Sequence, residues 1–112
     1  MRVAVSVVVA QVNAELNPRF GRTAAFVVVD TGTGQCEVLP NPGRQAAGGA
    51  GVQAAEFLVK QGVGAVVSGA FGPKASDVFR AAKIDMYQAS SGTVDELITK
   101  LQNGDLTVAD GG

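Results

Sequence analysis

The chain has 112 residues, of which 46% are hydrophobic, and this length and composition are typical of a single globular domain. Nine basic and ten acidic residues give a formal net charge of −1, which excludes a global attraction to nucleic acid or to an anionic membrane. One cysteine and no histidine exclude an internal disulfide and the usual Cys/His zinc sites, and they favour the reducing cytoplasm as the location.

The first half of the chain predicts three strands. Residues 3–9 are a continuous β-branched apolar run, typical of a strand buried on both faces and far shorter than the ~20 residues of a membrane span. Strands over 25–30 and 35–39 flank the glycine-containing turn at 31–34, which predicts an antiparallel hairpin. Cys36 is expected to be a buried structural thiol on the third strand.

The first helix is expected after a loop rich in glycine and alanine at residues 40–51. Apolar residues recur at helical spacing between Val52 and the stop at Gly62, which predicts the first helix. A short buried strand over 65–68 then leads into a helix that begins at Pro73, a position where the missing N–H of proline costs nothing.

The last predicted unit is a strand over 84–87 followed by a third helix. Thr93 and Glu96 have the spacing of a capping box at the start of that helix. We therefore expect one α/β domain over residues 1–104 and a flexible C-terminal tail over 105–112.

Right-handed crossover connections favour a five-stranded mixed sheet in the order 3-2-1-4-5, with strand 2 antiparallel and helices on both faces. In that arrangement the loops at 10–24, 40–51, 69–74 and 88–93 gather at the carboxyl edge of the sheet, where open α/β sheets bind ligands. Three helix N-termini are expected to point to this edge, with Phe20 and Phe71 as apolar walls. The loops carry four basic residues against one acid, Glu15: Arg19, Arg22, Arg44 and Lys74.

The edge is thus predicted to bind a small anion, and other sites are disfavoured. Residues 49–54 match the dinucleotide fingerprint, but they follow a long loop and no acid stands near Ser68, so NAD is not expected. Residues 69–74 are too short between their glycines for a P-loop and lack a Ser or Thr after Lys74, which argues against an ordinary ATP site.

Catalytic chemistry is also disfavoured, because a histidine-based triad is impossible and the acids are scattered. A metal-dependent nuclease needs clustered acids, which the pattern does not provide. We therefore expect neither an enzyme nor a nucleic-acid partner.

Six motifs in chain order resemble the dinitrogenase iron-molybdenum cofactor biosynthesis family, whose members include nitrogenase accessory proteins, the carboxyl-terminal domain of the cofactor-precursor synthase and the small orange protein. The motifs are NPRFGR (17–22), DTGTG (30–34), NP (41–42), GGAG (48–51), GAFGPK (69–74) and SGTV (91–94). The resemblance covers nearly the whole chain. It implies a ribonuclease-H-like α/β fold that binds an anionic metal–sulfur cluster, held non-covalently at the glycine-rich edge.

Carried over residue by residue, the resemblance implies a set of cofactor-binding candidates: Arg19, Phe20, Gly21, Arg22, Gly48, Gly49, Gly51, Gly72 and Lys74. Relatives often place a histidine or cysteine near these loops, and this chain has neither there, so direct metal ligation by the protein is not expected. Positive charge and backbone N–H groups can hold the sulfur atoms of a preformed cluster instead.

Two functions stay open at this point. The first is to carry or help to assemble a metal–sulfur cluster, either an iron-molybdenum cofactor precursor or a related molybdenum or iron sulfide. Its partners would include a donor protein, an acceptor protein or an ATPase. The second is a regulatory domain that uses the same edge to bind a partner protein, without cargo.

Overall fold

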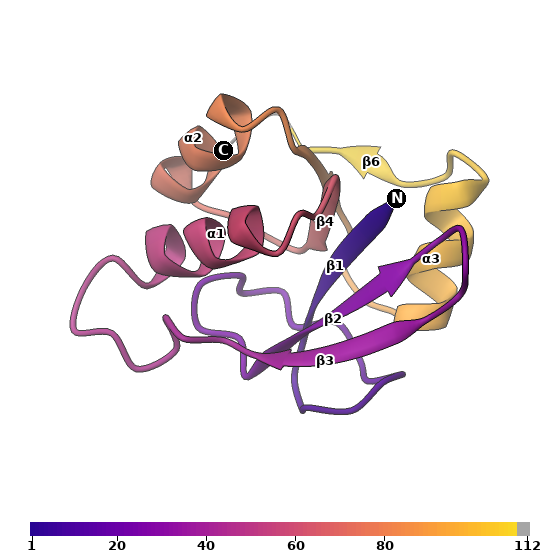
Figure 1. Ribbon diagram of the computed structural model, residues 1–112, viewed down its shortest axis with the longest axis horizontal. Coiled ribbons are helices and arrows are strands. Elements are labelled where there is room, and N and C mark those ends of the chain that lie inside the picture. Colours follow the sequence, from indigo (N-terminus) through magenta and orange to yellow (C-terminus); the bar gives the residue numbers. More distant parts are fainter. Residues whose placement is uncertain (110–112) are drawn as a thin grey trace.

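Continuous β-branched runs place β1 and β2 in the interior of one mixed sheet (Figure 1). The computed structural model describes residues 1–109, and within them the strand order is β3-β2-β1-β4-β5-β6. The strands are β1 (Arg2–Val7), β2 (Ala25–Asp30), β3 (Cys36–Pro40), β4 (Ala65–Ser68), β5 (Asp85–Gln88) and β6 (Thr107–Val108), and the helices are α1 (Ala50–Lys60), α2 (Pro73–Ala81) and α3 (Val94–Gln102). β1 pairs antiparallel with β2 and parallel with β4, which itself pairs parallel with β5.

The predicted order of the first five strands is confirmed, and so is the antiparallel orientation of β2. The prediction of five strands is wrong, because β6 pairs antiparallel with β5 and adds a sixth. The Ala109 N–H continues this pairing by donating to Met86 O at 2.9 Å. The fold is thus mixed α/β, and the ribonuclease-H-like motif that the resemblance implies is not confirmed.

β6 lies in the segment that we expected to be a flexible tail. It has only two residues, which is too short a run for a strand to be recognised from alternation of apolar and polar residues. Its pairing with β5 supplies hydrogen-bond partners for backbone groups of β5 that would be unpaired at the edge of a five-stranded sheet. Residues 110–112 of the predicted tail lie outside the described residues.

The helices cover both faces of the sheet, as predicted, because strand side chains alternate between two apolar layers. On one face, α1 and α2 pack over side chains such as Phe26 and Val66. On the other face, α3 packs over the alternate residues, including Val5 and Val67. No helix within residues 1–109 is long and apolar enough to cross a membrane.

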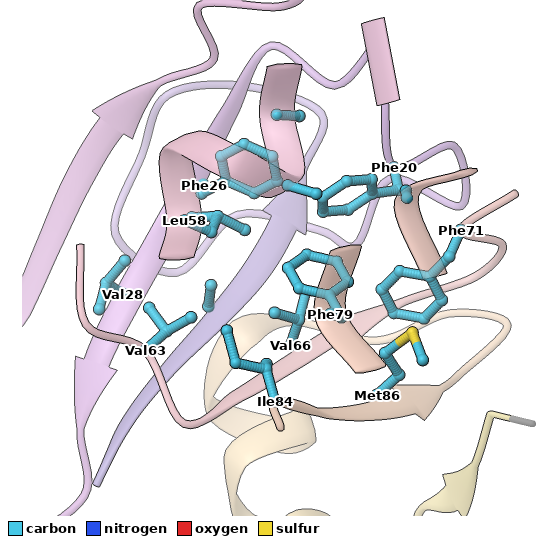
Figure 2. Close-up of a cluster of buried hydrophobic side chains, with 14 residues drawn as sticks. Phe20, Phe26, Val28, Leu58, Val63, Val66, Phe71, Phe79, Ile84 and Met86 are labelled. Carbon is cyan, nitrogen blue, oxygen red and sulfur yellow. The ribbon is translucent and has the colours of Figure 1, made fainter. Parts of the chain in front are cut away.

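Four phenylalanine rings form the centre of the layer beneath α1 and α2 (Figure 2). The ring of Phe20 lies 5.4 Å, centroid to centroid, from each of Phe26, Phe71 and Phe79. Phe20 belongs to the loop after β1, so this one side chain anchors that loop to the core.

Cys36 is exposed, and the prediction of a buried thiol is wrong. β3 is an edge strand whose residues are all exposed or only partly buried, because the helices cover the more central strands. The thiol makes a weak 3.6 Å contact with Gly34 O within its own hairpin.

The capping box predicted at α3 is present. Glu96 N–H donates to Thr93 Oγ1, while the Thr93 N–H and hydroxyl each lie 3.0 Å from Glu96 Oε1. The backbone hydrogen bond from Thr93, followed by the one from its hydroxyl, lowers the pKa of Glu96 below its ordinary 4.5.

We predict that the Thr93→Ala variant moves the pKa of Glu96 part of the way back to its ordinary value, because the hydroxyl hydrogen bond is lost while the backbone one remains. In the wild type, the stabilisation from this contact is complete above pH 4.5 and is lost as the pH falls through the lowered folded-state pKa. Carboxyl-carbon NMR titration measures the pKa. Thr99→Ala, at an exposed residue of the same helix, is the control, and identical Glu96 titrations in Thr93→Ala and wild type would contradict the assignment.

Candidate functional site

The loop at residues 8–24 lies across the ends of β1 and β4 at the carboxyl edge of the sheet, and we call it the crossing loop. Ser6 Oγ lies 2.8 Å from Asn17 O and 2.7 Å from Ser68 Oγ, so two buried hydroxyls hold the loop against both strands. A Cβ on Gly69 would lie only 2.6 Å from Pro18 Cα, so glycine is required where β4 leaves the sheet. The crossing loop is therefore fixed tightly in place.

The crossing loop brings Gly21 against the start of α1. A Cβ at this position would lie 2.9 Å from both the Cα and the N of Gly51, a separation too short for any side chain. Phe20 points into the core beside it and is 1% exposed, so this predicted cargo residue serves to anchor the loop. The NPRFGR motif thus supplies packing as well as surface groups.

The start of α1, the start of α2 and the crossing loop together line a hollow of about 380 Å³. We call it the α1/α2 hollow. Its lining residues are Gly21, Arg22, Gly49, Ala50, Gly51, Val52, Phe71, Gly72, Pro73, Lys74 and Ala75.

Both helices at the hollow begin without a side-chain cap and without an acid in the first turn. Their N-cap residues are Gly49, at φ 70°, and Gly72, at φ 80°. The first helical hydrogen bonds start from Gln53 N and Ser76 N, so the preceding amides have no helical acceptor. These amides belong to Ala50, Gly51, Val52, Lys74 and Ala75.

α3 differs in both respects, since its first turn contains two acids and its N-cap is closed by the Thr93–Glu96 box. It also lies on the opposite face of the sheet, where it connects β5 to the antiparallel β6. The N-terminus of α3 does meet the crossing loop at the carboxyl edge, where Thr93 bridges to Glu15 and the Asp95 N–H donates to Asn13 Oδ1 at 2.8 Å. It does not line the hollow, which the N-termini of α1 and α2 form.

Two cationic side chains line the hollow, and they differ in their contacts. Lys74 is an exposed residue of the first turn of α2. Arg22 Nη1 donates to Arg44 O at 2.9 Å and to Ala46 O at 2.8 Å. Arg44 thus contributes its carbonyl group to this contact.

The structure brings together six of the nine predicted site residues, namely Gly21, Arg22, Gly49, Gly51, Gly72 and Lys74. Phe20 is in the core, and neither Arg19 nor Gly48 belongs to the lining. Arg19 is exposed on the crossing loop, where its backbone pairs with Ala70, and Gly48 is exposed one residue before the N-cap of α1. The predicted apolar wall at Phe71 does line the hollow.

Asn41 is the residue whose role the sequence did not reveal. Its buried side-chain Nδ2 donates to Gly21 O and Thr23 O, each at 3.0 Å, and its Oδ1 accepts the Gly43 N–H at 2.9 Å. The available signal was the Asn-Pro-Gly turn at the end of a strand, where an asparagine side chain commonly bonds the backbone two residues on.

Within residues 1–109 no group of three or more Cys, Asp or Glu side chains is placed to ligate a metal ion, and the sequence contains no histidine. The hollow instead presents N–H groups and positive charge. This set of donors suits a preformed anion with exposed acceptor atoms.

Known proteins resemble this chain along most of its length. The family model described as "Dinitrogenase iron-molybdenum cofactor" matches residues 1–104. An uncharacterized protein of Methanocaldococcus jannaschii is 34% identical over 97 residues, which are 84% of this chain and 82% of that relative.

Solved structures agree with these sequence relatives. The apo form of the orange protein from Desulfovibrio gigas has a TM-score of 0.93 and 36% identity, over 98% of this chain and 93% of that one. A candidate NifB protein from Thermotoga has a TM-score of 0.83 and 31% identity, over 96% of this chain and 91% of that one.

We predict that Gly49→Ala destabilises the fold by about 1–2 kcal/mol, because Gly49 has the left-handed φ of 70° that a Cβ disfavours. Gly48→Ala is the matched control, since Gly48 has no positive φ and a Cβ there would meet no atom within 4 Å. Urea unfolding of the two variants gives the comparison. Equal stabilities would show that the N-cap conformation of α1 does not depend on glycine.

Proposed function

The chain belongs to the dinitrogenase iron-molybdenum cofactor family, and we propose that it binds an anionic metal–sulfur cluster in the α1/α2 hollow in order to carry the cluster or help to assemble it. The cargo is an iron-molybdenum cofactor precursor or a related molybdenum or iron sulfide. It is held non-covalently, and we assign no catalytic step to the protein.

The observation that carries this proposal is the pair of uncapped helix starts. Each leaves N–H groups without a helical acceptor at the positive end of its dipole, and both line the same hollow. Sulfur atoms of a cluster can accept hydrogen bonds from these N–H groups, and the metal atoms of the cluster then keep all their existing ligands. Such binding requires no histidine or cysteine from the protein.

Charge and access support the same conclusion. Lys74 adds a full positive charge beside the amides, and the first turns of α1 and α2 contain no acid to oppose an anion. Because the hollow is open to solvent, its occupant can enter and leave without unfolding the protein. Reversible binding of this kind is what a carrier needs.

We predict that anaerobic addition of tetrathiomolybdate to the wild-type protein changes the visible absorption and leaves molybdenum bound after gel filtration. Lys74→Gln should weaken the binding roughly threefold to tenfold, because one partly solvated charge is lost. Lys60→Gln, at the opposite end of α1, should bind like the wild type. No bound molybdenum with the wild type, or equal binding by all three proteins, would contradict the proposal.

A second candidate function, partner binding, is favoured by the apolar surface of the crossing loop. Val8, Val9 and Val12 are 44%, 46% and 50% exposed. The loop keeps a defined shape through hydrogen bonds from Val8 N to Glu15 O and from Gln11 N to Val9 O. Exposed apolar side chains gathered in one ordered loop are typical of an interaction surface, here for a cluster donor, a cluster acceptor or an ATPase.

We predict that a partner from the native host extract is retained by the wild type and lost by a variant with Val8, Val9 and Val12 all changed to serine. The three side chains are already half exposed, so the variant should keep the thermal stability of the wild type, which circular dichroism checks. Recovery of the same proteins in the same amounts by both forms would reject this loop as the interface.

A further inference from the structure

Arg22 bridges two segments of the chain that are far apart in sequence. Nη1 donates to the carbonyl oxygens of Arg44 and Ala46, at 2.9 and 2.8 Å, across 22 and 24 residues. Both acceptors lie in the loop that leads through Gly48 and Gly49 into α1. The guanidinium therefore holds the segment that delivers the first turn of this helix.

A second contact runs in the opposite direction. The Asn41 side chain, at the start of the same loop, donates to the carbonyl oxygens of Gly21 and Thr23 on either side of Arg22. Each segment thus holds the backbone of the other through a side chain. This reciprocal arrangement fixes residues 21–23 and 41–46 relative to each other.

The interlocked segments also set the position of α1. A Cβ on Gly43 would lie 2.6 Å from Ala50 O, and one on Gly21 would lie 2.9 Å from Gly51 N. With backbone contacts this close, a shift of either segment moves the amides at the start of α1.

We propose that Arg22 is a positioning residue for the cargo site: its guanidinium fixes the loop at residues 44–49, and through it the amides at the start of α1, and its charge is not what binds the anion. This inference rests on the proposed function, since it assigns the role of one residue within that site. It also distinguishes Arg22 from Lys74. The Lys74 ammonium group donates to no carbonyl oxygen among the described residues.

Arg22→Lys separates the two roles, because lysine keeps the charge but is one bond shorter and lacks the planar guanidinium. If Arg22 acts by positioning, Arg22→Lys and Arg22→Ala should both bind tetrathiomolybdate roughly tenfold or more weakly than the wild type. In Arg22→Lys, which keeps the charge, the relative loss of affinity between low and high salt should stay that of the wild type. Lys74→Gln should reduce that salt dependence, because it removes a charge that acts on the anion.

The second measurement is made on the protein without cargo. The N–H groups of Arg44 and Ala46 donate to Asn41 O and Gly43 O, at 3.3 and 3.1 Å, so amide hydrogen exchange reports whether the loop is held. We expect both amides to exchange faster in Arg22→Lys than in the wild type. Arg2→Lys is the matched control, since Arg2 also donates to a carbonyl, that of Gln61, but lies at the first residue of β1, at the other end of the strand from the hollow.

Two results would overturn the inference: binding by Arg22→Lys that equals the wild type, or unchanged exchange of the Arg44 and Ala46 amides in that variant. Failure of the wild type itself to bind tetrathiomolybdate would overturn the proposed function instead. In that case amide exchange alone decides the role of Arg22, where faster exchange supports positioning and unchanged exchange rejects it.

Discussion

The contact between Gly21 and the first turn of α1 is the constraint on which the whole carboxyl edge depends. No side chain fits between these two backbones, so the crossing loop and the helix are in direct backbone contact. The loop reaches this position because buried hydroxyls of Ser6 and Ser68 hold it at Asn17, and because the ring of Phe20 is inserted in the core. Packing that appears purely structural thereby shapes the α1/α2 hollow.

The electrostatics of the hollow follow from what its helices lack. The N-terminus of α3 is satisfied by its own Thr93 and Glu96 and by the crossing loop, where Ala14 O and Asn13 Oδ1 accept the Val94 and Asp95 N–H groups. α1 and α2 begin at glycines and have no acid in their first turns, so their positive ends stay available to a ligand. A ligand that supplies negative charge and several acceptor atoms would take the place of the missing caps, and this is the physical basis for our proposal of a metal–sulfur anion as the cargo.

Features set by neighbouring residues were predictable from the sequence. The apolar run of β1, the hairpin at residues 31–34 and the Thr93–Glu96 box all depend on local pattern, and each is present in the structure. The predicted first strand is too long by two residues, because β1 ends at Val7 and both Val8 and Val9 are exposed. The start of α2 at Pro73 was also predictable, whereas α1 begins at Ala50, two residues before its predicted start at Val52.

Features set by distant contacts were not predictable. Phe20 was interpreted as a wall of the site, because nothing in a loop motif shows that its ring meets Phe26 and Phe79 in the core. Arg22 was assigned to the cargo, because its carbonyl acceptors lie more than 20 residues away. Cys36 was expected to be buried although its strand was predicted at the sheet edge, because alternation along a strand does not reveal how far the helices extend over that edge.

The central claim is that an anion binds between the starts of α1 and α2. Backbone amide NMR shifts of the ¹⁵N-labelled protein during anaerobic titration with tetrathiomolybdate test it most directly. We expect the largest shifts at Gly51, Val52, Lys74 and Ala75, and little change at Asp95 in the first turn of α3. Shifts centred on α3 or on the hairpin around Cys36, with the α1 and α2 amides unmoved, would contradict this account.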